Sequence, residues 1–212
     1  MLMQAALSMT RRITFLIAPL VLVACSHADA TASIPNNSVM STSALMEVVK
    51  TRMLVYIAHP CFTDEQREFK NQLILRLKEQ LSNTKHGRQI SLIDPFDHSP
   101  NIEGSVEAKI RLSREVMETC IDLLEKCRVV IVVVDDGDTG AAFEAGYAHR
   151  MGIPILLVSK DTCDSANAML IGSCSARFDD ILDDMQISML VALLEWFYLQ
   201  RVHNGTEPGM ES

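Results

Sequence analysis

Short apolar runs alternate along the chain with longer segments in which apolar residues recur at helical spacing. Four of these runs, residues 53–58, 89–94, 128–134 and 153–159, have the length and composition of buried strands. The run at 128–134 is apolar at almost every position, which is typical of a central strand covered on both faces of a parallel sheet.

The segments between and after these runs have the signals of helices. Thr63 and Gln66 have the spacing of a capping box, and the helix that follows is predicted to bury an apolar face. That face consists of Phe69, Leu73, Leu75, Leu77 and Leu81.

Three more helices follow from capping signals and spacing. Ser105 can cap a helix that runs to about residue 126, a helix at about 140–151 ends before Gly152, and a last helix spans about 184–201. The predicted apolar positions of the helix at 105–126 are Ile110, Met117, Ile121 and Leu124. Those of the last helix are Leu190, Leu193, Leu194, Trp196 and Phe197.

This alternation of strands and helices predicts an α/β domain with a parallel sheet. Ligands bind such sheets beyond the carboxyl ends of the strands. Three polar loops lie at that edge: "HPCFTD" after the first strand, "DPFDH" after the second, and an acidic loop after Val134.

The acidic loop places Asp135, Asp136 and Asp138 shortly before Glu144, which belongs to the next helix. We expect Glu144 to lie within about the first turn, where the helix dipole and free amides favour an ionised carboxylate and a lowered pKa. If Asp138 folds back to about 5 Å from it, the pair has the arrangement of retaining glycosyl transfer. The alternative is that Asp138 only caps the helix and Glu144 only complements its dipole.

Composition narrows the range of partners. The chain has 212 residues, 48% of them hydrophobic, and a formal net charge of −8. Its length suits one domain with a full core. The negative charge and the lack of a basic patch argue against nucleic acid as a partner.

The N-terminal segment has the layout of a secretory signal. Arg11 and Arg12 precede an apolar run at 13–23, and "LVAC" at 22–25 resembles a bacterial lipoprotein cleavage box. This resemblance implies that residues 1–24 are removed and that Cys25 carries a diacylglyceryl chain, which would anchor the protein to the cell envelope (outer membrane or periplasm). The membrane would be contacted only through that lipid.

The alternative is a start at Met40, Met46 or Met53, which would leave the protein in the cytoplasm. Incorporation of labelled palmitate at Cys25 distinguishes the two. Residues 25–52 are predicted to be a flexible tether, 53–203 the domain, and 204–212 a disordered tail.

The five cysteines after Cys25 do not form a recognisable framework. Their number is odd and no CxxC or zinc-ligand spacing is present, so we predict neither a disulfide scaffold nor a metal site.

Four segments together resemble the nucleoside 2-deoxyribosyltransferase family. They are "VYIAHPCFTDEQREF", "IDLLEKCRVVIVVVDD", "DTGAAFEAGYAHRMGIP" and "NAMLIGS", and they cover roughly residues 54–180 in the family's order. The resemblance implies a flavodoxin-like three-layer sandwich around a central parallel sheet.

The resemblance also implies roles for individual residues. Glu144 would be the nucleophile that forms a deoxyribosyl ester, Tyr56 would hold it in place, and Asp138 would orient the deoxyribose. Asp122 would be a proton-handling carboxylate. Asn167 would reach the sugar of a neighbouring subunit, so the active unit would be at least a dimer.

For three residues near the predicted base pocket, the resemblance implies a less specific role. Asp97 and His98 stand where the family often contacts the base, although His98 fits a surface loop equally well. His59 stands where a glycine is common in the family. Its side chain would narrow the base pocket or add a hydrogen bond, so it would influence base preference.

The predicted activity is retaining transfer of 2-deoxyribose between nucleobases through a covalent glutamyl intermediate, with slow hydrolysis by water. The partners would be deoxyribonucleosides and free nucleobases, with no cofactor. The alternatives are hydrolysis of deoxynucleoside 5′-monophosphates or of NAD, and a nucleoside-binding module without catalysis.

Overall fold

The computed structural model describes residues 52–99 and 105–204. The predicted signal peptide at 1–24, Cys25, and all but the last residue of the predicted tether lie outside these ranges. So does the tail from residue 205, while the last helix includes residue 204, which had been predicted to belong to the tail.

Five parallel strands form one sheet in the order β2-β1-β3-β4-β5. Each predicted strand contains one of the first four, which are β1 (Met53–Ala58), β2 (Ile90–Ile93), β3 (Val129–Val133) and β4 (Ile155–Val158). The fifth, β5 (Ala176–Phe178), was not predicted. It has only three residues, and the exposed Arg177 interrupts its apolar pattern.

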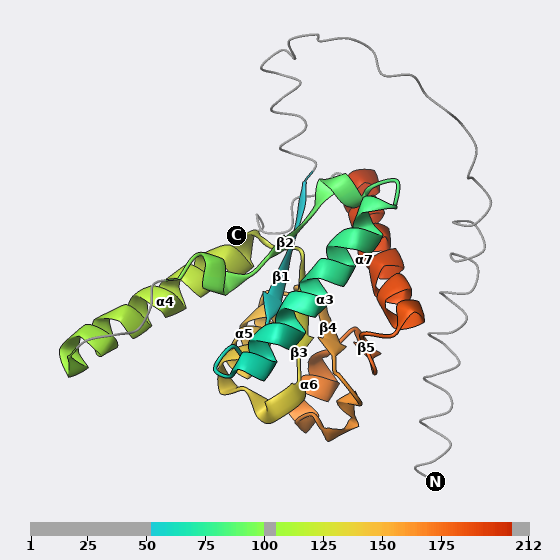
Figure 1. Cartoon of the computed structure of the whole chain (residues 1–212). Helices are drawn as coiled ribbons and strands as arrows, with labels where there is room; N and C mark the ends of the chain where they lie inside the picture. Colours follow the sequence, from blue (N-terminus) through green and yellow to red (C-terminus); the bar gives the residue numbers. More distant parts are fainter. Residues whose placement is uncertain (1–51, 100–104, 205–212) are drawn as a thin grey trace. The chain divides into compact units, whose positions relative to one another are not determined.

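Helices cover both faces of the sheet, which confirms the predicted three-layer α/β sandwich (Figure 1). Helices α3 (Asp64–Ser82) and α7 (Asp184–Asn204) pack on one face. Helices α4 (Val106–Lys126), α5 (Thr139–Arg150) and the unpredicted, short α6 (Ala168–Ser173) pack on the other. The strand order is that of flavodoxin-like folds, whose ligands bind where the chain switches between β1 and β3.

Successive residues of β1 face opposite layers because side chains alternate along a strand. Val55 packs in the core beneath α3 and α7, whereas Tyr56 packs in the core beneath α4 and α5. This alternation brings the phenol of Tyr56 to the layer that contains the helix after the acidic loop.

The helical faces differ from the prediction at three positions. In α3, residues at spacings of four are buried, but Leu75 is 56% exposed because it lies two residues from Leu73 and faces away from the sheet. In α4, Ile110 and Met117 are exposed and only Leu124 is buried, because this helix contacts the sheet near its C-terminal end. None of the helices in the described ranges is long and apolar enough to cross a membrane.

Two consecutive left-handed residues shape the turn between β3 and α5. Asp136 has φ 64° and Gly137 has φ 62°. Aspartate tolerates this conformation better than most residues, and glycine adopts it without strain. The turn sets the direction in which Asp138 enters α5.

Replacing Gly137 by alanine should therefore strain this turn. A Cβ there meets no atom within 4 Å, so the expected loss of about 1–2 kcal/mol in the free energy of unfolding comes from the backbone alone. Gly146→Ala, inside α5 and equally uncrowded, is the matched control and should gain about 0.5–1 kcal/mol. Urea titration of both variants measures the difference, and equal effects would contradict the argument.

Candidate active site

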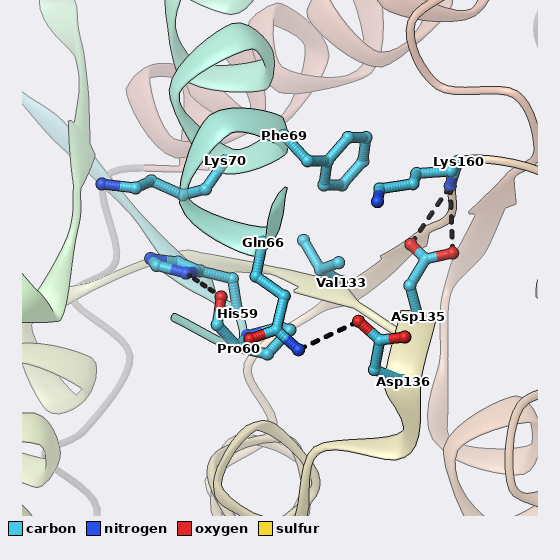
Figure 2. A pocket seen from close by; sticks show the side chains of 9 residues that line it. All are labelled: His59, Pro60, Gln66, Phe69, Lys70, Val133, Asp135, Asp136 and Lys160. Carbon is cyan, nitrogen blue, oxygen red and sulfur yellow. Dashed lines mark hydrogen bonds between the residues drawn. The ribbon is translucent and has the colours of Figure 1, made fainter. Parts of the chain in front are cut away.

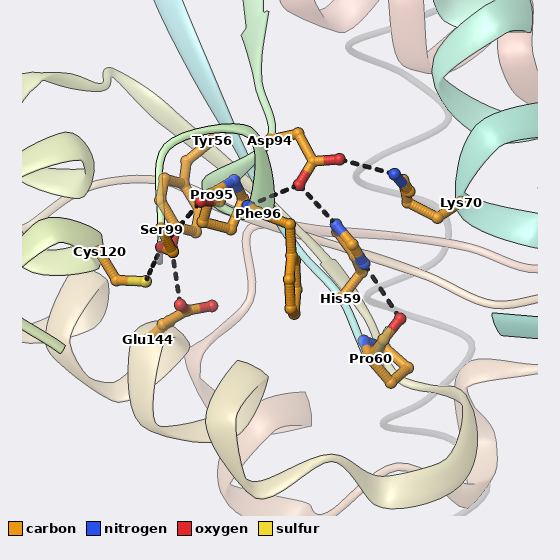
Figure 3. Close-up of polar contacts among 10 residues, drawn as sticks. All are labelled: Tyr56, His59, Pro60, Lys70, Asp94, Pro95, Phe96, Ser99, Cys120 and Glu144. Carbon is orange, nitrogen blue, oxygen red and sulfur yellow. Dashed lines mark hydrogen bonds and ion pairs between the residues drawn. The ribbon is translucent and has the colours of Figure 1, made fainter. Parts of the chain in front are cut away.

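The phenol of Tyr56 and the carboxylate of Glu144 meet where β1 ends beside α5. The Tyr56 hydroxyl donates a hydrogen bond of 2.6 Å to Oε1 of Glu144 (Figure 3). Burial, followed by the negative charge of Glu144, raises the pKa of Tyr56 above its usual range. The phenol therefore stays protonated at neutral pH and keeps donating to the carboxylate.

The environment of Glu144 differs from the prediction in two respects. Asp138 is the N-cap of α5, so Glu144 is the sixth helical residue and lies beyond the first turn, where the dipole acts most strongly. Its pKa is raised, not lowered. Burial is the largest cause and outweighs the hydrogen bond from Tyr56, and the negative charge of Asp138 adds to the rise.

Asp138 caps α5 through its side chain. Its two oxygens accept hydrogen bonds from the backbone amides of Gly140, at 3.3 Å, and Ala141, at 2.8 Å. The residue is half-buried, and its charge acts on Glu144. The cap thus fixes the position from which the negative charge of Asp138 acts on Glu144.

The other two carboxylates of the acidic loop have structural partners (Figure 2). Asp135 accepts hydrogen bonds from the Ser159 hydroxyl, at 2.8 Å, and from the backbone amide of Lys160, and so joins the ends of β3 and β4. Asp136 accepts a 3.0 Å hydrogen bond from Gln66 of α3. Asp135 and Asp136 therefore stand close together in the sequence because each accepts hydrogen bonds from a different partner.

Helix α4 supplies a thiol to this site. Cys120 is half-buried and has its sulfur 4.0 Å from the hydroxyl of Ser99 (Figure 3). The predicted residue of this helix, Asp122, lies two positions further along and is exposed, and its charge acts on Tyr147. Residues two apart on a helix do not share a face.

A buried ionic network lies next to Glu144, and the sequence did not predict it. His59 and Asp94 are 4% and 6% exposed, and Nε2 of His59 is 3.0 Å from Oδ1 of Asp94. Lys70 donates to the other Asp94 oxygen at 2.9 Å. Burial alone would raise the pKa of Asp94, but hydrogen bonds from His59 and Lys70 and the positive charge of His59 hold it well below its usual range.

The partners of His59 limit what it can offer a nucleobase. Its Nδ1 lies 3.0 Å from the carbonyl oxygen of Pro60, so both ring nitrogens are engaged. No nitrogen is left for the predicted hydrogen bond to a base. The ring also lies 5.2 Å from that of the half-exposed Phe96, measured between centroids. Narrowing of the base pocket by His59 stays a prediction.

The remaining predicted residues, Asp97, His98 and Asn167, are exposed. Asp97 and His98 are exposed in the turn after β2. Asn167 is exposed and caps α6, where its side chain accepts from the amide of Met169. It lines a polar cavity of about 390 Å³ at the ends of β3 and β4, and Glu144 is not among the lining residues.

Within residues 52–99 and 105–204, no group of His, Cys, Asp and Glu side chains could hold a metal ion. The cysteines in these ranges are free thiols, and two of them, Cys127 and Cys163, are buried.

Comparison with known families gives a match over most of the domain. Residues 55–185, more than half of the chain, match the sequence model of the family described as "Nucleoside 2-deoxyribosyltransferase". A comparison with curated proteins gave no match.

Two solved structures illustrate the structural likeness. A 2-deoxyribosyltransferase from Bacillus psychrosaccharolyticus is 24% identical, with a TM-score of 0.46, over 63% of this chain and 90% of that one. A conserved protein from Enterococcus faecalis V583 is 16% identical, with a TM-score of 0.52, over 66% of this chain and 98% of that one. The second likeness supports the α/β fold and nothing further.

Proposed function

Because this chain belongs to the nucleoside 2-deoxyribosyltransferase family, we propose that it moves 2-deoxyribose between nucleobases through an ester on Glu144. The observation that carries this proposal is the placement of Glu144. Its carboxylate is held by Tyr56 at 2.6 Å, near the charge of Asp138 and at the edge of the sheet where ligands bind.

The reaction would proceed in two displacements at C1′ of the sugar. In the first, an oxygen of Glu144 forms a bond to C1′ while the glycosidic C–N bond breaks. Its electron pair goes to the departing base, which takes up a proton. In the second, a nitrogen of another base attacks C1′, the ester bond breaks, and the incoming base loses a proton. Two inversions restore the original configuration.

The neighbours of Glu144 suit this chemistry. The hydrogen bond from Tyr56 fixes one carboxylate oxygen, which leaves the other to approach the sugar. Partial burial costs the ionised carboxylate solvation, which is consistent with its raised pKa and favours its reaction once ionised. The half-buried Asp138 lies near enough to orient a sugar hydroxyl, its proposed role.

The location of Asn167 supports a shared site. In a single chain it lines a cavity whose lining residues do not include Glu144. A role at the sugar is therefore easier to reconcile with a second subunit than with its own, and we propose that the active unit is at least a dimer. A single-chain species with full activity in analytical ultracentrifugation would contradict this proposal.

The proposed activity can be tested with deoxyinosine and adenine. The protein should form deoxyadenosine, because adenine intercepts the ester, and it should release hypoxanthine slowly when adenine is omitted. Chromatography of the nucleosides measures both. Deoxyinosine 5′-monophosphate and NAD serve as competing substrates that test the hydrolase alternatives. If the folded protein consumes no deoxynucleoside, the proposed transfer is wrong.

A further inference from the structure

Phe96 is a half-exposed aromatic residue whose position is fixed by buried groups. It belongs to the 3₁₀ turn Pro95–Asp97 after β2, and its backbone amide donates to Oδ1 of Asp94 at 3.0 Å. Its ring centroid lies 5.2 Å from that of the buried His59. Despite these contacts 48% of Phe96 is exposed. A large apolar side chain that is both held in place and open to solvent is suited to contact a ligand.

The Phe96 ring lies at the edge of the sheet that also holds Glu144. Tyr56, which donates to Glu144, is the register partner of Ile93, and the turn that contains Phe96 begins two residues after Ile93. In the view of Figure 3 the Phe96 ring lies between the side chains of Glu144 and His59. The face of the ring that His59 does not cover is therefore on the side of the candidate nucleophile.

The hydrogen bonds of His59 fix its ring at both nitrogens. Nδ1 faces the carbonyl oxygen of Pro60 and Nε2 faces the ionised Asp94, each at 3.0 Å, and both of these oxygens only accept hydrogen bonds. A ring that satisfies both carries a proton on each nitrogen and is a cation. A cation within about 6 Å of a phenyl centroid is attracted to the ring face, so His59 also stabilises the position of Phe96.

We propose that the open face of Phe96 is the surface on which the nucleobase stacks, and that His59 is the positioning residue that holds this ring. The inference rests on the proposed function, because the base is the group that leaves the sugar at Glu144. Stacking needs only a π face, which every purine and pyrimidine has, so the ligand class is the nucleobase itself. Neither nitrogen of His59 is free for the base, and its influence on the base therefore passes through Phe96.

The first test is kinetic. Phe96→Ala should lower kcat/KM for deoxyinosine roughly five- to 150-fold, the range for removing an aromatic ring that stacks on a base. The loss should appear mainly as a raised KM, because stacking holds the base in the ground state as well as in the transition state. Phe96→Trp, which keeps an aromatic face, should restore the KM. Leu75→Ala is the control, because Leu75 is 56% exposed on α3 and faces away from the sheet, and it should change neither constant.

The role of His59 is tested by a double-mutant cycle. His59→Asn keeps a donor for Asp94 but removes the ring behind Phe96, and it should raise the same KM about two- to fivefold. In the Phe96→Ala background, His59→Asn should have no further effect on KM. Independent, multiplying effects would overturn the positioning role of His59. The Phe96 variants leave the buried network intact, so they test the stacking surface even if His59→Asn does not fold.

The closing experiment measures binding without turnover, in Glu144→Gln protein. Calorimetric titration with deoxyinosine gives a Kd that should rise when Phe96→Ala is added and stay near its starting value with Phe96→Trp or Leu75→Ala. Equal affinity with and without the Phe96 ring, or no binding at all, would overturn the inference even if the wild type transfers deoxyribose. Binding that depends on Phe96, in a protein whose wild type shows no transfer, would retain the inference and reject only the proposed reaction.

Discussion

Glu144→Gln should reduce the rate of deoxyribosyl transfer by on the order of 10⁴-fold or more, as the loss of a principal catalytic group does. The amide can still accept the hydrogen bond from Tyr56, so the site should keep its geometry while losing its nucleophile. Glu144→Ala should show a similar loss. Steady-state kinetics with deoxyinosine and adenine measures the effect.

Asp138→Asn is the informative companion variant. It should keep an oxygen that can cap α5 but lose a charge near the sugar, and its activity should fall between those of the wild type and Glu144→Gln. Mass spectrometry of quenched enzyme should place a deoxyribosyl adduct on the peptide "AAFEAGYAHR". The adduct should be absent in Glu144→Gln, and an adduct on any other residue would reject the proposed nucleophile.

The raised pKa of Glu144 also predicts a pH dependence. Activity that requires the ionised carboxylate should fall as pH decreases through this raised pKa, at higher pH than for an ordinary glutamate.

A carboxyl whose pKa is higher in the folded than in the unfolded state contributes stability below its unfolded pKa and loses that contribution as pH rises. Glu144→Gln should therefore be more stable than the wild type at pH 8, with the difference decreasing in acid.

The largest expected effect on stability is at Asp94. Asp94→Asn should lower the free energy of unfolding by about 3 kcal/mol, because it leaves His59 and Lys70 without the buried charge that they face. Asp64→Asn is the matched control. It breaks an ion pair with Arg67 in which the carboxylate is fully exposed, and stability should scarcely change.

The sign of the pH dependence follows from the lowered pKa of Asp94. Its contribution should be present above the ordinary carboxyl pKa and lost only as pH falls towards the lowered value. The stability difference between wild type and Asp94→Asn should therefore be full at neutral pH and shrink in strong acid. Urea titrations at several pH values measure it, and equal losses for Asp94→Asn and Asp64→Asn would contradict the buried network.

The regular elements were predictable because their signals are local. The capping box of Thr63 and Gln66 is formed as its spacing indicated, and the apolar run after Cys127 forms the central strand β3. Strand β5 was not predictable, since three residues carry too little periodicity and depend on pairing with β4. The exposed stretch of α4 was misassigned because amphipathic spacing does not say how far a helix extends beyond its sheet.

At the site, the sequence by itself determined that a parallel sheet would bring the acidic loop and Glu144 to one edge, whereas the role of Tyr56 was implied only by the resemblance to the family. Alternation along strands and the placement of strand ends depend only on chain order and period. The tertiary structure alone decided which groups touch Glu144 and what they do to it. Tyr56 donates to Glu144 and Asp94 engages His59, because such contacts depend on the rotation of each helix and the path of each loop. Burial, which no local pattern specifies, raised the pKa of Glu144 where proximity to a helix terminus had predicted the opposite.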